Sequence, residues 1–468
     1  MNEVKWQLNR LRPSPVWVAV VLSAGIIGCQ ILFAPGYVDN GDFAGVLRSN
    51  GLYQLSHATR FSWHFGVMQY YNPAFLVHGT TQSLLIQIAM LLSRLTGHSH
   101  FFDIRYLGFV YGLIYLGGIG LLTWAITTPK RTVKNYFLAG LVVVVLADAG
   151  IVRYFNSLYP QAATLILIVY VVALALLLIR YKTAKLWLVF SYFMAVILLL
   201  MVNEDGNFWC VGVIFITLSL WCGPMLEKRR PYLIAGIGLI LIFSVITATN
   251  LPKDAQMMNK YQAFTQGALV ENQHPERYPA AKQINPQFTL MRGNAYYPTA
   301  YAALKPNGAY TQRHLLQRYN LSWVVTSYVN SGTQFSRLLN VMAKNTLVIP
   351  LTTQGSVISF VGYSQLMATF YPKTYGFNVL LALVILSGYA VGLVTGLRRH
   401  QWAGFSRFMM MFGLLTTIIL IPIVTIVNYG LANLAVHLVP VVACLNLSLI
   451  LVVADCCHRR ILRGTEDE

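Results

Sequence analysis

Residues 16–33 read VWVAVVLSAGIIGCQILF, a stretch of eighteen positions without a charged side chain. A run of about 20 apolar residues is long enough to cross the hydrocarbon core of a bilayer as a helix. The stretch follows Lys5, Arg10 and Arg12. Because it is long and further apolar runs come after it, we expect an uncleaved signal-anchor rather than a signal peptide. This stretch therefore predicts a membrane protein.

The composition of the whole chain agrees with this first span. Of the 468 residues, 56% are hydrophobic and 10% are charged, and the mean hydropathy is +0.57. These values are typical of a polytopic helical membrane protein that has the lipid bilayer as its solvent. The formal charge of +19 does not indicate a nucleic-acid partner, because membrane proteins use basic residues to set their orientation.

The pattern of apolar runs predicts an all-α fold with ten transmembrane helices, interfacial helices and one large extracytoplasmic loop. A further apolar segment, Ser83–Gly97, has only 15 residues. If this segment crossed the membrane, three basic clusters would face outward, so the positive-inside bias favours an interfacial position and places both termini inside. The expected spans are roughly 16–33, 105–127, 136–152, 161–180, 186–202, 207–223, 231–249, 376–397, 408–427 and 431–454.

This topology divides the chain into three regions. Residues 1–249 form an N-terminal transmembrane catalytic module, whose first outer loop covers 34–104, and residues 376–468 form the C-terminal helices and a cytoplasmic tail. The outer region 250–375 between them carries 11 basic and 3 acidic residues, a net charge of +8. It is either an electrostatic surface for anionic partners, such as lipid phosphate or an anionic wall polymer, or simply a soluble basic loop.

Two acids, Asp39 and Asp42, directly follow the first span. The chain has only 15 acidic residues, so few other carboxylates compete for acid–base chemistry near the membrane surface. Their spacing of three puts both on one face if the stretch is helical. Such a carboxylate is suited to take the proton from a sugar hydroxyl as general base. The alternative is a capped turn without a catalytic role.

The expected second outer loop begins at Arg153, between the third and fourth spans. We expect Asp148 to lie about one turn deep in the membrane before it, and an intramembrane acid is a functional hypothesis by default. The alternative is a structural salt bridge from Asp148 to Arg153 or Arg105. The other candidate substrate-binding or phosphate-binding residues of this loop are Tyr154, Asn156 and Tyr159.

Two further outer turns carry polar residues. Glu204 and Asp205 are adjacent in the third outer turn; they are either a solvated turn or part of a substrate or cation site. Oxygen ligands suit Mg²⁺ or Mn²⁺, so a divalent cation held with Asp39 or Asp42 is possible, although no spacing demands a metal. His437 is expected near the outer end of the last span, as a hydrogen-bond partner for phosphate or as a structural histidine.

Several motifs carry a resemblance to a known class. The first outer loop opens with an acidic motif directly after the first span, which resembles the GT-C class of integral-membrane glycosyltransferases. More narrowly, VDNGDF at 38–43 and YFNSLY at 154–159 resemble a family of bacterial glycan-biosynthesis hexose transferases from Gram-positive cells. LAVHL at 434–438 is similar to the closing motif of that family, and FTQG at 264–267 and NQHPE at 272–276 look related.

The resemblance implies a hexosyltransferase in the bacterial cell membrane, with its active site on the extracytoplasmic side. It implies a polyprenyl-phosphate-linked sugar donor, a cell-wall or surface glycan as acceptor, and a catalytic base that is Asp39 or Asp42. The chain departs from the family pattern at Pro160-Gln161, where an acid is expected, and at Val436, where a lysine often precedes the closing histidine.

Two other functional classes compete with the transferase. A transporter or flippase for a lipid-linked glycan precursor would carry polar residues deep in the bilayer and repeat symmetry. The expected acids cluster instead at one membrane face, and we find no repeat in the sequence. A non-catalytic assembly factor would give no transfer of a labelled sugar at all.

Overall fold

The computed structural model describes most of the chain, and every structural statement below concerns the described residues. These are residues 13–39, 43–55, 61–70, 79–180, 186–202, 209–221, 230–251, 253–275, 283–296, 304–347, 362–398 and 402–458. The predicted site residues Asp42, Glu204 and Asp205 lie outside them.

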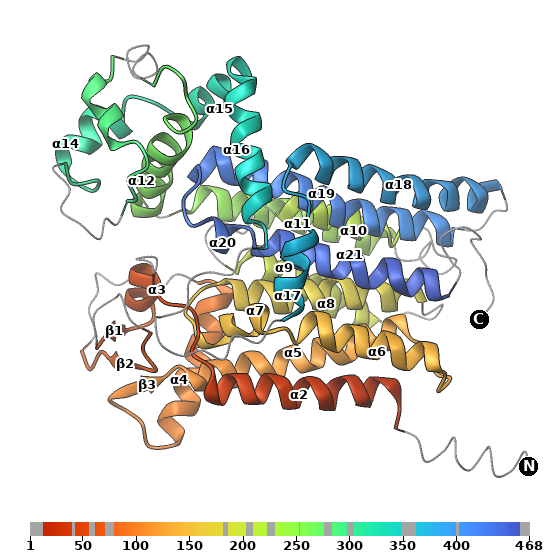
Figure 1. The fold of residues 1–468 in the computed structure, drawn as a ribbon. Helices are drawn as coiled ribbons and strands as arrows, with labels where there is room; N and C mark the ends of the chain where they lie inside the picture. Colours follow the sequence, from red (N-terminus) through yellow and green to blue (C-terminus); the bar gives the residue numbers. More distant parts are fainter. Residues whose placement is uncertain are drawn as a thin grey trace, which may run out of the picture.

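Helices make up most of the fold, and three short strands lie near its N-terminal part (Figure 1). In chain order the elements are α2 (Pro15–Phe33), α3 (Phe43–Ser49), β1 (Leu52–Gln54), β2 (His64–Val67), α4 (Thr81–Leu95), β3 (Phe101–Asp103), α5 (Arg105–Ile126), α6 (Val133–Leu146), α7 (Ala149–Val152), η1 (Arg153–Asn156), α8 (Gln161–Arg180), α9 (Leu186–Leu200), α10 (Cys210–Leu218), α11 (Arg230–Thr249), α12 (Lys253–Gln262), η4 (Ala263–Ala268), η5 (Pro286–Met291), α14 (Ala309–Thr311), η6 (Gln312–Leu316), α15 (Leu321–Asn330), α16 (Gly332–Asn345), α17 (Tyr363–Phe370), α18 (Tyr375–Arg398), α19 (Ala403–Tyr429), α20 (Leu434–His437) and α21 (Val439–Cys457).

The long helices run side by side, and most of the short elements gather at one end of this bundle (Figure 1). That end holds the three strands with α3, α12, α14, α15 and α16. We call it the site end, because Asp39 follows the last turn of α2 there. We call the opposite end, to which Arg180 and Arg398 belong as the last residues of α8 and α18, the basic end.

Seven helical segments are long and apolar enough to cross a membrane, and they confirm seven of the predicted spans. An eighth crossing is possible where α6 and the α7–η1 segment form a pair bent by 47°. The predicted span 186–202 corresponds to α9, with 15 residues, and the predicted span 207–223 contains α10, with 9 residues. The chain is therefore a multi-pass membrane protein, and the count of ten spans is not confirmed.

Burial separates the central helix from the peripheral ones. In α8, 83% of the apolar window is buried inside the protein, against 22% in α2 and 17% in both α11 and α18. The central helix contacts α5, α9 and α21. Apolar side chains that face outward from α2, α11 and α18 are exposed among the described residues, as expected for helices that face lipid.

A small sheet in the first outer loop was not predicted from the sequence. The strands β1, β2 and β3 pair antiparallel in this order, with Leu52 opposite Val67 and His64 opposite Asp103. The side chain of Phe65 is buried. Strands of three or four residues are too short to show a reliable alternation of polar and apolar positions, which explains the miss.

Helix α4 corresponds to the short segment predicted to lie at the membrane surface. Its apolar side chains Leu84, Leu91 and Leu95 are exposed along one stripe. At its start, the Thr81 hydroxyl donates a hydrogen bond to the carbonyl of Leu198 at 2.7 Å, which fixes α4 to the site end of α9. An exposed apolar stripe is typical of an interfacial helix, and its position in the membrane stays a prediction.

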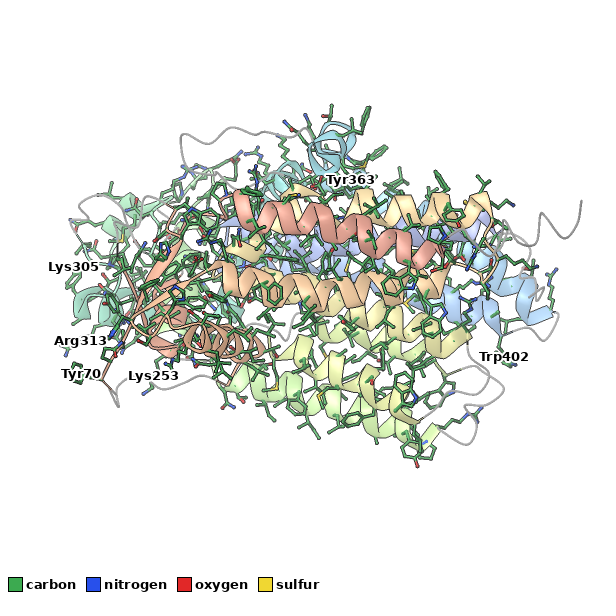
Figure 2. All side chains as sticks on the ribbon, turned by 90° about the horizontal axis from the view of Figure 1, so that it is seen from below. Tyr70, Lys253, Lys305, Arg313, Tyr363 and Trp402 are labelled. Atoms are coloured by element: carbon green, nitrogen blue, oxygen red, sulfur yellow. The ribbon has the colours of Figure 1, made fainter. Side chains whose placement is uncertain are left out.

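Most of the described residues of the region 250–375 form short helices at the site end. Figure 2 shows Lys253, Lys305 and Arg313 at the same end of the molecule as Tyr70 of the first outer loop, whereas Trp402 lies at the other end. Helix α17 is different, because it lies against α6 and α7 beside the bundle. Its placement brings the chain segment just before α18 close to Asp148.

Candidate active site

The chain leaves α2 in an extended conformation at Ala34 and reaches Asp39 before α3 begins. Oδ1 of Asp39 accepts a hydrogen bond from the backbone N–H of Phe43 at 3.1 Å. This is a capping contact at the start of α3, and it holds the carboxylate in one orientation. The predicted capped turn and the predicted reactive carboxylate are therefore compatible at this residue.

Asp39 lines a small cavity at the site end. The first outer loop lines this cavity through Gln54, Ser62 and Phe65, and the second outer loop lines it through Asn156. The cavity volume of about 10 Å³ is near the lower limit for a single water molecule. A sugar would therefore enter only when these walls move apart.

Asn156 fixes the exit of α2. It is 2% exposed, and its amide nitrogen donates hydrogen bonds to the carbonyls of Ile31 and Ala34, both at 3.0 Å. The backbone carbonyl oxygen of Asn156 lies so close to Gly36 that a Cβ on residue 36 would be 1.9 Å from it. Glycine is required at this crossing, and the second outer loop determines where the chain carries Asp39.

Tyrosines complete this support. The Tyr37 hydroxyl donates to the carbonyl of Gly150 at 2.9 Å, and the Tyr159 hydroxyl donates to the carbonyl of Val38 at 3.0 Å. The ring of Tyr154 packs on that of Tyr37 with centroids 4.4 Å apart. Burial raises the pKa of Tyr37 well above its ordinary value, so this residue stays a hydrogen-bond donor.

The predicted substrate-binding residues Tyr154, Asn156 and Tyr159 are thus 2–3% exposed. Asn156 and Tyr159 bond to the backbone between α2 and Asp39, and Tyr154 bonds to the carbonyl of Ala435. In this conformation they position the site, and direct substrate contact by any of them stays a prediction.

Replacing Asn156 by alanine is expected to lower the free energy of unfolding by about 3 kcal/mol, because two carbonyls at the end of α2 lose a buried donor. The measurement is the thermal unfolding of the purified protein in detergent. The matched control is Asn345→Ala, which removes one bond to Val341 within the same helix and is expected to cost about 1 kcal/mol or less. Equal losses in the two variants would contradict the role of Asn156.

Asp148 lies at the break of the bent helix pair rather than within a continuous span. It is 6% exposed and caps α7, with its carboxylate accepting the N–H of Gly150 at 2.9 Å. Gly362, just before α17, is so close that a Cβ there would lie 2.3 Å from Oδ1 of Asp148. Burial, and then the charge of Asp148, raise the pKa of Tyr363 to about 12. The Asp148 carboxylate is therefore enclosed between the backbone of α7 and the chain just before α17.

Arg153 begins the short helix η1, and it is partly exposed. Its positive charge and the negative charge of Asp148 both act on the Tyr37 hydroxyl, in opposite directions. Both charged groups therefore lie near the Tyr37 hydroxyl. Arg105, the other predicted partner of Asp148, forms its ion pair with Asp103.

His437 lies at the end of α20, where its ring stacks on Tyr429 with centroids 4.1 Å apart and an interplanar angle of 16°. Two residues of the second outer loop bond to the backbone just before it. The Tyr154 hydroxyl donates to the carbonyl of Ala435 at 3.4 Å, and the Gln161 amide donates to that of Val436 at 3.3 Å. The last outer turn is thus joined to the loop that supports Asp39.

The large outer region, 250–375, also contacts the last outer turn. The N–H of Leu431 donates to the carbonyl of Gln266 at 3.0 Å. At Gly267, a Cβ would lie 3.2 Å from the Cα of Gly430, so the two backbones touch. The structure therefore brings together the motif after the first span, the second-loop motif, the FTQG motif and the closing motif, although they are far apart in the sequence.

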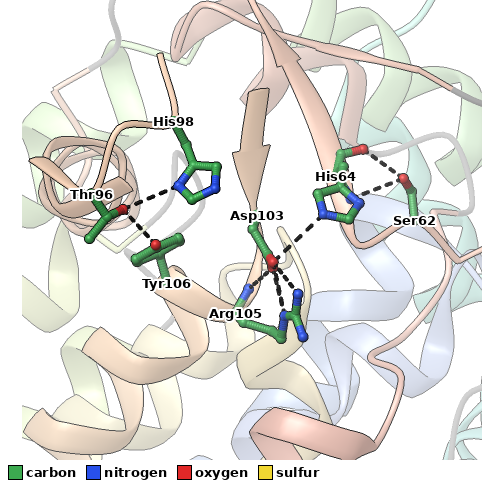
Figure 3. Close-up of polar contacts among 7 residues, drawn as sticks. All are labelled: Ser62, His64, Thr96, His98, Asp103, Arg105 and Tyr106. Atoms are coloured by element: carbon green, nitrogen blue, oxygen red, sulfur yellow. Dashed lines mark hydrogen bonds and ion pairs between the residues drawn. The ribbon is translucent and has the colours of Figure 1, made fainter. Parts of the chain in front are cut away.

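A polar cluster on the sheet, shown in Figure 3, was not recognised from the sequence. The Arg105 side chain donates hydrogen bonds to the Asp103 carboxylate, with Nε 2.9 Å and Nη2 2.5 Å from Oδ2. His64 on the neighbouring strand approaches the same oxygen at 3.7 Å, and the Arg105 guanidinium lies over the ring of Trp63. The cluster joins the sheet to the first turn of α5 and so fixes the wall of the Asp39 cavity.

Substituting Asp103 by asparagine is expected to cost about 1–2 kcal/mol of unfolding free energy, because the bidentate pair is lost while the Arg105 side chain, 43% exposed, regains water. His64→Ala removes a longer and more exposed contact, so less than about 0.5 kcal/mol is expected. Both values follow from denaturation of the purified variants, and a larger loss for His64→Ala would contradict the assignment of Asp103 as the centre of the cluster.

The described residues contain no group of three or more His, Cys, Asp or Glu side chains arranged to hold a metal ion. Three of the acids proposed for a divalent cation site, Asp42, Glu204 and Asp205, are outside the described part of the chain. A Mg²⁺ or Mn²⁺ ion at this place therefore stays a hypothesis.

Comparison with known proteins gives a match to a family and a likeness to solved structures. The family described as the YfdI N-terminal transmembrane domain matches residues 1–468. Among solved structures, the archaeal oligosaccharyltransferase AglB from Archaeoglobus fulgidus, in complex with an inhibitory peptide and a dolichol-phosphate, is similar with 13% identity and a TM-score of 0.36. The likeness covers 97% of this chain and 52% of AglB, so the chain spans about half the length of that protein. No curated protein matches the chain.

Proposed function

The chain belongs to the family of the YfdI N-terminal transmembrane domain, and from this premise we propose that it is a membrane glycosyltransferase. It moves a hexose from a polyprenyl-phosphate-linked donor to a cell-wall or surface glycan outside the cell. The observation that carries the proposal is the placement of Asp39, an oriented carboxylate that lines a cavity where the chain leaves a membrane span. The bacterial cell membrane is the proposed location, with the site end outward.

The proposed reaction is a single displacement with inversion. Asp39 takes the proton of an acceptor hydroxyl, and the oxygen attacks the anomeric carbon of the donor sugar. The bond between that carbon and the phosphate oxygen breaks, and polyprenyl phosphate leaves with the electron pair. The backbone N–H of Phe43 holds Oδ1 of Asp39, so the direction in which the carboxylate accepts a proton is set before the substrate arrives.

The leaving phosphate carries negative charge, which needs cations or hydrogen-bond donors around it. Arg153 is the cation of the second outer loop that lies near Tyr37. His437 is joined to the same loop through the backbone of α20. Basic side chains of the large outer region, among them Lys305 and Arg313, lie at the same end of the molecule (Figure 2). These residues are the proposed support for the phosphate.

One observation favours the rival class, a flippase or transporter. Asp148 lies at the break of a helix pair bent by 47°, and transporters place their substrate sites at broken helices. Asp148 is used in this structure as a cap within the contact between α7 and α17. A transport role would need that contact to open.

An assay in detergent separates the two classes, because a micelle has no two compartments between which a substrate is moved. Purified protein is mixed with polyprenyl-phosphate-linked hexose that is radiolabelled in the sugar, together with a wall or surface glycan. Transfer of label to the glycan, with an inverted anomeric configuration, is the expected result. The transporter interpretation is correct if two results are found together. No combination of donor hexose and glycan gives transfer, and vesicles that contain the protein move the lipid-linked sugar across the bilayer.

A further inference from the structure

A large apolar groove lies among α5, α8 and α9, away from the Asp39 cavity. Its volume is about 720 Å³, which is within the range of cavities that bind small molecules. The walls are almost entirely hydrocarbon, from side chains such as Ile114, Leu174 and Met194. Since α5 and α8 are both candidate membrane spans, the material available to fill this groove is lipid.

The groove follows about half of α5 and almost the whole of α9, from Trp187 to Leu198. On α5 it starts at Ile114, near the middle of the helix, and ends at Trp124, close to the basic end. Ten residues of α-helix rise about 15 Å, which is half of a hydrocarbon core of about 30 Å. On α5 the groove therefore has the length of the acyl chains of one leaflet and lies toward the basic end.

The basic end of the groove has the side chains expected beside a lipid head group. Trp124 and Trp187 line the groove there and are 44% and 60% exposed; tryptophan is enriched at this depth in membranes. Arg180 follows on α8, and its Nη1 donates to the carbonyls of Trp124 and Thr127 at 2.7 and 2.6 Å. The guanidinium is thus fixed beside the tryptophan that closes the groove.

We propose that this groove is a binding site for an anionic phospholipid. Its acyl chain lies between α5, α8 and α9, and its phosphate lies at the basic end beside Arg180. A cation near the surface attracts anionic lipid, and Arg180 supplies one at this end of the groove. The site is separate from the proposed transfer reaction, because its phosphate lies at the basic end and it uses none of the residues assigned to that reaction.

The short helix α9 forms one wall of the groove. Its 15 residues rise about 22 Å, which is less than the hydrocarbon core of about 30 Å. Beside α5 and α8, which have 22 and 20 residues, it is the shortest of the three helices that line the groove. A lipid chain that stays in place would fill this space and hold α9 against the bundle.

The test uses the whole protein in nanodiscs made of equal amounts of phosphatidylglycerol and phosphatidylcholine. After transfer to detergent, native mass spectrometry identifies the lipids that remain bound. We expect one phosphatidylglycerol per chain, in preference to phosphatidylcholine. A phosphatidylglycerol with a photoreactive acyl chain is expected to label peptides that contain Trp124 or Met194.

Two variants distinguish binding of the lipid head group from binding of the acyl chain. Arg180→Gln is expected to lower the preference for phosphatidylglycerol about fivefold, equivalent to about 1 kcal/mol. Ala195→Phe narrows the groove, which Ala195 lines, and is expected to abolish both retention and labelling. The matched controls are Arg398→Gln at the basic end of α18 and Leu383→Phe on its exposed face, and both should behave like the parent protein.

Three results would overturn the proposal. The first is labelling spread over α2, α11 and α18 without enrichment in the groove. The second is an equal loss of lipid preference in Arg180→Gln and Arg398→Gln. The third is the retention of added polyprenyl phosphate in place of phospholipid, which would assign the groove to the donor chain. None of these readouts depends on sugar transfer, so the site fails or stands separately from the proposed enzyme.

Discussion

Replacing Asp39 by asparagine is expected to reduce the rate of sugar transfer by about 10²- to 10⁴-fold, which is the contribution of a general base. Asparagine keeps the size of the side chain and an oxygen that accepts the N–H of Phe43, but it takes no proton. The protein should therefore fold as before. The rate is measured with radiolabelled donor in detergent, at saturating acceptor, together with the unfolding temperature of each variant.

The control for Asp39 is Glu271→Gln, another acid-to-amide change, in the large outer region. Glu271 adopts a positive φ of 57° in a turn and is not among the residues that line the cavity. Its replacement should leave transfer within about twofold of the parent protein. If Asp39→Asn kept more than about a tenth of the activity with an unchanged unfolding temperature, Asp39 would not be the base. Asp42 would then be the remaining acid of the first-loop motif.

The second large effect is expected at Gly430, in the turn between α19 and α20. Its φ of 61° and ψ of −131° belong to a region that residues with a Cβ rarely adopt, at a cost of about 1–3 kcal/mol. A Cβ would also lie 2.4 Å from the backbone of Gln266 and Gly267. That backbone cannot move away freely, because Leu431 is hydrogen-bonded to Gln266. Gly430→Ala should therefore cost about 3–5 kcal/mol in all.

Gly97→Ala is the matched control for Gly430→Ala. Gly97 also has a positive φ, 91°, but nothing lies within 4 Å of a Cβ placed there, so only the backbone strain of about 1–2 kcal/mol applies. Thermal unfolding of both variants in detergent gives the comparison. Similar losses would show that the contact between the FTQG motif and the last outer turn adds nothing to stability.

The membrane-spanning helices were predictable because length and hydropathy alone define a span. Residues 16–33 and 161–180 correspond to α2 and α8 within one residue at each end. The chain between 186 and 223 was less predictable, since α9 and α10 are shorter than their apolar runs. The strands of the first outer loop were missed for another reason: their pairing is set by contacts between segments such as His64 and Asp103, not by any local pattern.

The site was predictable in its motifs but not in the contacts between them. The sequence indicates Asp39 as a candidate base, because acids are rare and this one follows a span. It also indicates Asn156 as a substrate-binding residue, whereas the structure uses its amide to hold the end of α2. An amide in a short loop has the same appearance in the sequence in both cases, because the identity of its partners depends on the tertiary fold.

The enclosed position of α8 has a consequence for how the protein is assembled. This helix is the most apolar of the spans, with a hydropathy of 3.0 over its window, although it touches little lipid once the fold is complete. A helix enters the bilayer alone, before its neighbours surround it. Its hydrophobicity therefore drives insertion, and the sizes of its side chains determine how it packs afterwards. The small residues Ala162, Ala163 and Ala175 then let adjacent helices approach closely. Assembly of the bundle must therefore finish around a helix that was already inserted.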